Sequence, residues 1–196
     1  MKKASKTREY IIENTAPVFN KKGYFGTSMA DITKATGLTK GAIYGNFSDK
    51  EEVAVAALEY NINKLNYKIT TRVVAVDTAK EKFNAYLEVF QEMAPDVLNY
   101  GGCAYMNSAI ETDDTNPHLF KIVQKRFKGW IHGLEKLVEM GQQANEISNQ
   151  VNPTEFAYFF VSIVEGSILL SKTLNNPNVI YNNLEILRKQ IDNIFL

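Results

Sequence analysis

The hydrophobic pattern of this chain follows the period of an α-helix almost throughout its length. No segment alternates apolar and polar residues over several positions, as a half-buried β-strand does. Glycine, proline and polar capping residues interrupt the pattern at intervals typical of separate helices. The sequence therefore predicts an all-α fold with nine or ten helices.

The boundaries of the helices follow from residues that start or stop them. Gly23 is placed to end the first helix, Ser48 and Glu51 have the spacing of a capping box that opens the fourth, and Pro95 is expected to close the fifth. The expected helices span about residues 6–22, 28–37, 39–46, 49–72, 78–94, 103–111, 117–145, 153–174 and 179–195. The first three form a short unit, and longer helices follow it.

The charge of the chain is divided between its two ends. The 196 residues include 22 basic and 22 acidic side chains, so the formal charge is zero. Residues 1–50 hold nine Lys or Arg and four Asp or Glu, a net charge of +5, and residues 51–196 carry the balancing −5. Such asymmetry suggests that the N-terminal segment meets a polyanion. We therefore expect two domains, residues 1–50 and 51–196, with the helix at about 49–72 as connector.

Several classes of protein are disfavoured by composition. One cysteine, Cys103, allows no intramolecular disulfide, and the histidines, His118 and His132, are too isolated for a metal cluster, so no metal or cofactor is expected. No nucleophile, base and orienting group share a recognisable spacing, so an enzyme is not expected. The most apolar stretch, residues 156–170, is interrupted by Glu165 and is shorter than the ~18 apolar residues of a membrane span. We expect a soluble, cytoplasmic protein with no membrane partner.

Residues 28–47 have the layout of a helix-turn-helix. Gly37 lies at the turn between the helices, where a left-handed backbone is often needed. The positions spaced to bury one side are Ile32, Ala35, Leu38, Ile43 and Phe47. The side expected to face solvent carries Ser28, Thr39, Lys40, Gly41, Ala42, Tyr44, Gly45 and Asn46. Small residues allow close approach to another surface, and hydroxyls, an amide and a lysine can contact phosphates and base edges.

Over about residues 6–65 the sequence resembles the tetracycline-repressor (TetR) family of bacterial transcriptional regulators. The matching residues are Gly23-Tyr24, Thr27-Ser28-Met29, Ile32, Gly37-Leu38, Thr39 to Tyr44, and Phe47 leading into Lys50-Glu51. The resemblance implies a DNA-facing surface made of Lys40, Gly41, Ala42, Tyr44, Gly45 and Asn46, with Ser28 and Lys50 as phosphate anchors. It also implies a homodimeric repressor of a near-palindromic double-stranded operator, released by a small effector of unknown identity.

Individual roles on this surface can be assigned from side-chain chemistry. Lys40 is expected to reach a guanine edge or a phosphate, Ala42 a thymine methyl, and Asn46 an adenine or a phosphate. For Tyr44, a phosphate contact and partial burial against the first helix both remain open.

In the resembled family the C-terminal region dimerises and binds the effector. We expect the dimer interface to use the helices at 117–145 and 153–174, because the latter is apolar nearly all round; packing within one subunit is the alternative. Aromatic and methionine side chains suit an effector pocket but could equally be core. The candidate lining residues are Phe83, Tyr86, Phe90, Met93, Tyr100, Cys103, Tyr105, Met106, Asn107 and Trp130.

Cys103, Asn107 and Glu111 recur every four residues and so share one helix face. This pattern, after Gly102, resembles a branch of the family in which a cysteine senses electrophiles or oxidants, with Lys172 as a conceivable partner. A small buried apolar cysteine is the alternative. A further alternative is a DNA-binding co-regulator without a small ligand.

Overall fold

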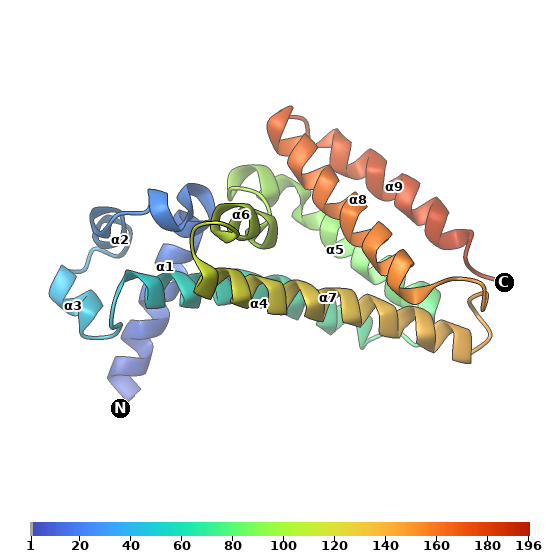
Figure 1. The fold of residues 1–196 in the computed structure, drawn as a ribbon, viewed down its shortest axis with the longest axis horizontal. Coiled ribbons are helices and arrows are strands. Elements are labelled where there is room, and N and C mark those ends of the chain that lie inside the picture. The colour runs from blue at the N-terminus through green and yellow to red at the C-terminus, as the bar shows by residue number, and fades with distance from the viewer. Residues whose placement is uncertain (1) are drawn as a thin grey trace. The chain divides into compact units, whose positions relative to one another are not determined.

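The computed structural model describes residues 2–196, with no account of the side chains of residues 2–5, 97 and 98. Over this range it contains nine α-helices and no strand, which confirms the all-α prediction (Figure 1). The helices are α1 (Lys2–Gly26), α2 (Met29–Thr36), α3 (Lys40–Tyr44), α4 (Lys50–Val73), α5 (Ala79–Asn99), α6 (Ala104–Thr112), α7 (Pro117–Gln143), α8 (Pro153–Thr173) and α9 (Asn178–Asp192).

The residues pack into two compact units. The first comprises the chain up to Leu65 together with Tyr100–Val123, and the second comprises Asn66–Asn99 and Gln124–Leu196. The packing therefore groups the start of α4, all of α6 and the start of α7 with the three N-terminal helices. The division expected at residue 50 follows charge and motif, whereas the division by packing runs through α4 and α7.

The first unit is built on one apolar cluster. Buried side chains of α1, α2, α3 and α4 meet there, which removes the apolar stripe of each helix from water. The buried members are Ile11, Ala16, Phe19, Ile32, Ile43, Phe47, Val53, Ala54 and Ala57. Because α3 has five residues, its position depends on this packing and not on its own helix propensity.

The second unit is organised around aromatic contacts between α5 and α8. Phe83 of α5 packs edge-on against Phe156 at a ring distance of 5.6 Å, and it also contacts Phe160. Figure 1 shows α8 and α9 antiparallel and side by side, with α5 along the same pair. The end of α8 is also joined to the start of α9 by a hydrogen bond, in which the Ser171 Oγ accepts the Ile180 backbone N–H.

Helix α8 has the length and composition of a membrane-spanning helix, but part of it is buried in the protein fold. Its buried side includes the polar residues Glu165, Ser167 and Ser171, which a lipid-facing helix seldom carries. Its exposed side holds large apolar side chains, including Leu169 and Leu170. The helix therefore has two apolar sides, and only one is covered within the chain.

The expected end of α5 at Pro95 is wrong. Helix α5 continues through Pro95 to Asn99, and Gly101 and Gly102, with φ of +98° and +96°, follow its actual end. An internal proline removes one backbone hydrogen bond, but the flanking turns can keep theirs. The Asn99 side chain donates to the Pro95 carbonyl, which supplies a further bond in the last turn.

The capping box expected for α4 is displaced by one residue. The Asp49 carboxylate accepts the Glu52 backbone N–H at 2.8 Å, and the Glu52 carboxylate accepts the Ser48 N–H at 2.7 Å. Glu51 does not act in this cap, because its carboxylate interacts with Asn116 and His118. The expected pair, Ser48 and Glu51, is therefore replaced by hydrogen bonds of Asp49 and Glu52.

Candidate functional site

The helix-turn-helix is fixed by short-range hydrogen bonds. Ser28 and Asp31 form a capping box at the start of α2, and Thr39 caps α3 by accepting the Ala42 N–H. Gly37 adopts a φ of +69°, and its N–H donates to the Thr33 carbonyl at 2.8 Å. A glycine tolerates this left-handed backbone without the strain of a Cβ atom, so the turn sets the direction in which α3 leaves α2.

Helix α3 exposes most of the residues expected to face DNA. Ile43 is buried in the core of the unit, whereas the opposite face is open to solvent. The exposed members of the predicted set are Ser28, Thr39, Lys40, Gly41, Tyr44 and Gly45, and Ala42 is half-buried. Tyr44 is 46% exposed, so its hydroxyl can reach a ligand outside the fold. These exposed residues are mostly small or polar, and Lys40 is the one lysine among them.

Two predicted DNA contacts have roles within the protein. Asn46 is half-buried and donates its side-chain N–H to the Ala42 carbonyl at 2.9 Å. The Lys50 ammonium donates to the carbonyls of Tyr24 and Thr27, at 2.8 and 3.0 Å, and lies over the Tyr24 ring. Lys50 therefore joins the start of α4 to the connection between α1 and α2. A DNA role for either side chain stays a prediction.

Arg8 supports the surface and was not identified from the sequence. Its guanidinium lies 4.0 Å from the Phe47 ring centroid, donates to the Asn46 carbonyl, and pairs with Glu52 at 2.7 Å. A guanidinium can stack and form two directed hydrogen bonds at once, which a lysine cannot do. The Arg8 side chain thus fixes the residues that follow α3 against α1 and α4. No local sequence motif predicts this role of Arg8, because its hydrogen-bond partners lie 38 to 44 residues away in the chain.

Two carboxylates of this unit have lowered pKa values. The hydrogen bond from Lys22, followed by those from Ser28, holds the pKa of Asp31 far below its usual range. The Ser48 backbone N–H, followed by Arg8, lowers the pKa of Glu52. A carboxyl whose pKa is lower in the folded state stabilises the fold above its unfolded-state pKa, and this contribution is lost as the pH falls through the folded value.

The urea midpoint of the native protein should therefore fall as the pH is lowered from 5 toward 3, across the range where unfolded carboxyls protonate. An Asp31→Asn/Glu52→Gln variant should have a lower midpoint at pH 7 and a smaller change between pH 5 and 3. Urea unfolding at pH 7, 5 and 3 measures both effects, with Glu13→Gln on the exposed side of α1 as control. A pH dependence equal to that of the native protein would contradict the assigned role of the two carboxyls.

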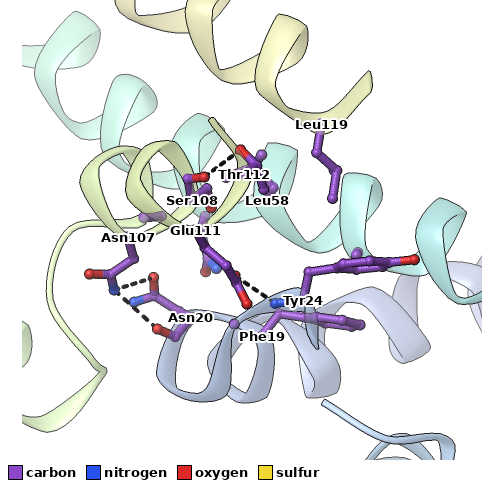
Figure 2. Close-up of a pocket in the computed structure, with 13 residues that line it drawn as sticks. Phe19, Asn20, Tyr24, Leu58, Asn107, Ser108, Glu111, Thr112 and Leu119 are labelled. Atoms are coloured by element: carbon purple, nitrogen blue, oxygen red, sulfur yellow. Dashed lines mark hydrogen bonds between the residues drawn. The ribbon is translucent and has the colours of Figure 1, made fainter. Parts of the chain in front are cut away.

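Helix α6 is hydrogen-bonded to the end of α1. The Glu111 carboxylate accepts the backbone N–H groups of Tyr24 and Phe25, at 2.8 and 3.0 Å. The Asn107 side chain donates to the carbonyls of Asn20 and Gly101, at 3.1 and 2.8 Å. Figure 2 shows Asn107 and Glu111 directed from α6 toward α1. The four-residue spacing noted in the sequence therefore places both side chains against the same partner.

This contact requires two glycines. Gly23 has a φ of +73° and a ψ of 178°, and a Cβ there would lie 2.3 to 2.5 Å from the Glu111 carboxyl. A Cβ on Gly101 would lie 2.9 Å from the Asn20 carbonyl oxygen. Gly23 ends the regular part of α1, as expected. The Glu111 carboxylate accepts hydrogen bonds from the backbone N–H groups of the two residues that follow Gly23.

Two of the cavities among the described residues differ greatly in size. One lies within the first unit between α1, α4, α6 and α7 and has a volume of about 30 Å³ (Figure 2). The other lies within the second unit and has a volume of about 390 Å³. Because ligand pockets usually enclose about 300 to 1,000 Å³, the second cavity can hold a small organic molecule, whereas the first has room for a water.

The larger cavity is lined by three helices of the second unit. Its residues are Asn66, Ile69 and Thr70 of α4, Tyr86 of α5, and Lys125, Arg126, Gly129 and Trp130 of α7. Tyr86 and Trp130 were in the predicted pocket, and the other six were not. Lining residues on α4 and α7 recur at four-residue intervals, as in Asn66 and Thr70 or Lys125 and Gly129, a pattern that the search for aromatic and methionine residues did not consider.

The remaining predicted pocket residues lie elsewhere. Phe83 and Phe90 are buried, and Phe90 packs on Trp130 at a ring distance of 5.9 Å. Met93 is half-buried and Tyr100 is exposed. The members that belong to the first unit are Tyr100, Cys103, Tyr105, Met106 and Asn107, and of these Asn107 lines the small cavity. Aromatic character alone did not separate cavity lining from core.

Cys103 occupies the N-cap position of α6 and is 8% exposed. Its side chain makes no cap hydrogen bond to the helix. A thiol reacts as the thiolate and must be reached by the reagent, so burial disfavours a sensing role in this conformation. Sensing through Cys103 stays a prediction.

Family models match both parts of the chain. Residues 11–57 match the model described as bacterial regulatory proteins, tetR family, and residues 79–187 match the tetracyclin repressor-like C-terminal domain. The second match alone covers more than half of the chain.

Solved structures of other proteins match the fold of this chain over its full length. A TetR-family transcriptional regulator from Cytophaga hutchinsonii is 38% identical, with a TM-score of 0.90 over 100% of this chain and 98% of that one. A TetR transcriptional regulator from Chloroflexus aurantiacus is 32% identical, with a TM-score of 0.93 over the same shares. The sequence of the HTH-type transcriptional repressor DhaR from a Mycobacterium species is 24% identical over 86% of this chain and 84% of the relative. This chain therefore belongs to the tetR family of bacterial regulatory proteins and is a helix-turn-helix transcriptional regulator of that family.

Proposed function

We propose that this regulator is a cytoplasmic homodimeric repressor that leaves a near-palindromic operator when a small effector enters the 390 Å³ cavity. The observation that carries the DNA-binding part is the exposed polar face of α3, opposite the buried Ile43. A dimer would place two such helices about 34 to 36 Å apart, one turn of duplex DNA. The net charge of +5 in residues 1–50 supports salt-dependent attraction to phosphates.

The exposed apolar side of α8 supports a dimer interface on that helix. Tyr158, Phe159, Leu169 and Leu170 are exposed there, and Ser162 and Gly166 on the same side allow close approach of another helix. Ile186 adds an exposed apolar side chain on α9. The sequence predicts α7 as the second interface helix, but the exposed residues of α7 are mainly lysine, glutamine, histidine and glycine. The distribution of apolar surface favours α8 with α9.

Helix α4 contributes residues to both the cavity and the helix-turn-helix unit, so it can transmit a conformational change from one to the other. It begins with Lys50, which holds the connection between α1 and α2, and its later turns contribute Asn66, Ile69 and Thr70 to the cavity. An effector relieves repression only if its affinity differs between the two conformations of the protein. With a typical coupling of about 1 to 3 kcal/mol, operator affinity would fall about 5- to 150-fold.

Lys40→Ala should weaken operator binding on the order of tenfold, because one lost base or phosphate contact costs about 1 to 3 kcal/mol. If Lys40 contacts a phosphate, the slope of log affinity against log salt should fall by about 1; if it contacts guanine, discrimination at one base pair should fall. Tyr44→Phe should also weaken binding. An operator selected from random duplexes, followed by binding assays at several salt concentrations, measures these effects.

Lys64→Ala is the matched control for this experiment. It removes one exposed charge from α4, and Lys64 lies 14 residues, or about 20 Å, along that helix from Lys50. Its affinity should stay within about twofold of the native protein. If the operator affinities of Lys40→Ala and Tyr44→Phe both stay within about threefold of the native protein at fixed salt, α3 is not the helix that contacts the operator.

A further inference from the structure

We infer that the 390 Å³ cavity selects an organic anion, a molecule with an acidic group on an apolar body. This inference rests on the proposed effector role of the cavity and names the chemical class of its ligand. Two of the eight lining residues are cationic, Lys125 and Arg126, and none is acidic. A ligand carboxylate could therefore be neutralised without meeting a like charge in the wall.

The two cations are consecutive residues of α7 in the lining of the cavity. Lys125 is exposed and Arg126 is half-buried. Among the described residues, Lys125 has no acidic partner, so its ammonium is available to a ligand. Gly129 lies one turn beyond Lys125, and a Cβ there would meet no atom within 4 Å. The glycine leaves open space beside the cations, into which the body of a ligand can extend.

The rest of the lining suits an apolar body and one directed polar group. Trp130 is 8% exposed, packs on Phe90 and Phe127, and presents a fixed aromatic wall. Ile69 adds an aliphatic side chain. Burial raises the pKa of Tyr86 to about 12, so its hydroxyl stays protonated at neutral pH and can donate a hydrogen bond to an anion.

The sign of the charge in this wall is opposite to that of its surroundings. Residues 51–196 carry a net charge of −5, yet the cavity is lined by two positive side chains. Glu88 and Glu92, on the same helix as Tyr86, are paired with Arg72 and do not line the cavity. A cationic ligand would meet the positive charge of Lys125, and a neutral ligand would make no use of that charge.

Trp130 is the single tryptophan of the chain, so its fluorescence reports on this cavity. We would titrate the full-length protein with 4-tert-butylbenzoate, its neutral amide and 4-tert-butylbenzylamine, excited at a wavelength these probes do not absorb. Decanoate, decanamide and decylamine form a second series with a linear body. In at least one series the anion should bind on the order of tenfold more tightly than the amide, with the cation weakest.

Lys125→Gln/Arg126→Gln should weaken the anion on the order of tenfold and leave the amide within about twofold. Lys128→Gln removes an exposed charge from the same helix outside the cavity and is the matched control, expected to change neither affinity. Gly129→Leu should weaken all probes, because its side chain would enter open space in the cavity.

Each outcome separates the ligand class from the effector role. Equal binding of anion, amide and cation, or anion binding unchanged in Lys125→Gln/Arg126→Gln, overturns the anion inference and leaves the cavity as an effector site. Binding of the anion without release of the operator supports the ligand class and contradicts the effector role. No change in Trp130 fluorescence with any probe of either series overturns both.

Discussion

A Leu169→Asp/Leu170→Asp variant is expected to be monomeric and to bind the operator about 10²- to 10⁴-fold more weakly than the native protein. Both leucines are exposed on α8, at 47% and 46%, on the helix side that the chain itself does not cover. In a two-fold interface the aspartates of both subunits would be buried against the same patch of the partner, without a positive charge to pair with. Burial of an unpaired charge is strongly unfavourable. A monomer contacts the operator with one recognition helix. It therefore loses the additional affinity that a dimer gains by binding two half-sites at once.

Light scattering during size-exclusion chromatography measures the mass, and a binding assay with the selected operator measures affinity. The matched control is Tyr67→Asp/Gln124→Asp, which adds the same charge at exposed positions on α4 and α7. This control should remain dimeric. Circular dichroism verifies that both variants are folded. A folded Leu169→Asp/Leu170→Asp variant that remains dimeric with native operator affinity would remove α8 from the interface.

Gly23→Ala is expected to lower the free energy of unfolding by about 3 kcal/mol. The backbone at Gly23 has a φ of +73° and a ψ of 178°, a region essentially confined to glycine. The added Cβ would also lie 2.3 to 2.5 Å from the Glu111 carboxyl and displace it. Displacement breaks the hydrogen bonds from Tyr24 and Phe25, so both backbone strain and lost charge-assisted bonds contribute.

In a protein of this length the melting temperature should fall by about 6 to 12 °C, measured by calorimetry. Gly26→Ala is the control, since its Cβ would make only an ordinary 3.6 Å contact with Lys22. Adding Glu111→Ala to Gly23→Ala should cost less than the sum of the two single changes, because the clash and the lost bonds share one carboxylate. A melting temperature of Gly23→Ala within about 1 °C of the native protein would show that the α1 backbone relaxes at no cost.

The helix-turn-helix was predictable because short-range chemistry specifies it. Ser28 caps α2 from three residues away, Thr39 does the same for α3, and Gly37 occupies the left-handed turn between them. Each of these interactions spans at most four residues, so the sequence contains both partners side by side. The exposed face of α3 follows from the helical period once Ile43 is placed in the core.

Two predictions of helix ends failed. Helix α5 continues through Pro95, because the flanking turns keep their hydrogen bonds. At the start of α4, Asp49 caps the helix in place of Ser48, while Glu51 interacts with the distant residues Asn116 and His118. The cavity shows the same limit. Tyr86 was identified as a candidate by its aromatic side chain, but Lys125 and Arg126 on an exposed helix face resemble any other solvated charges until α4 and α5 are placed beside them.

The sequence by itself determined the all-α class, the boundary between a basic and an acidic part, and the face of α3 that is exposed to solvent. These depend on helical period, caps and composition, which are properties of neighbouring residues. Only the tertiary structure decided that Glu111 holds the end of α1, that Arg8 holds the end of α3, and that two cations border a cavity beside Trp130. Those contacts join residues far apart in the chain, and the free energy of packing, not local preference, selects them.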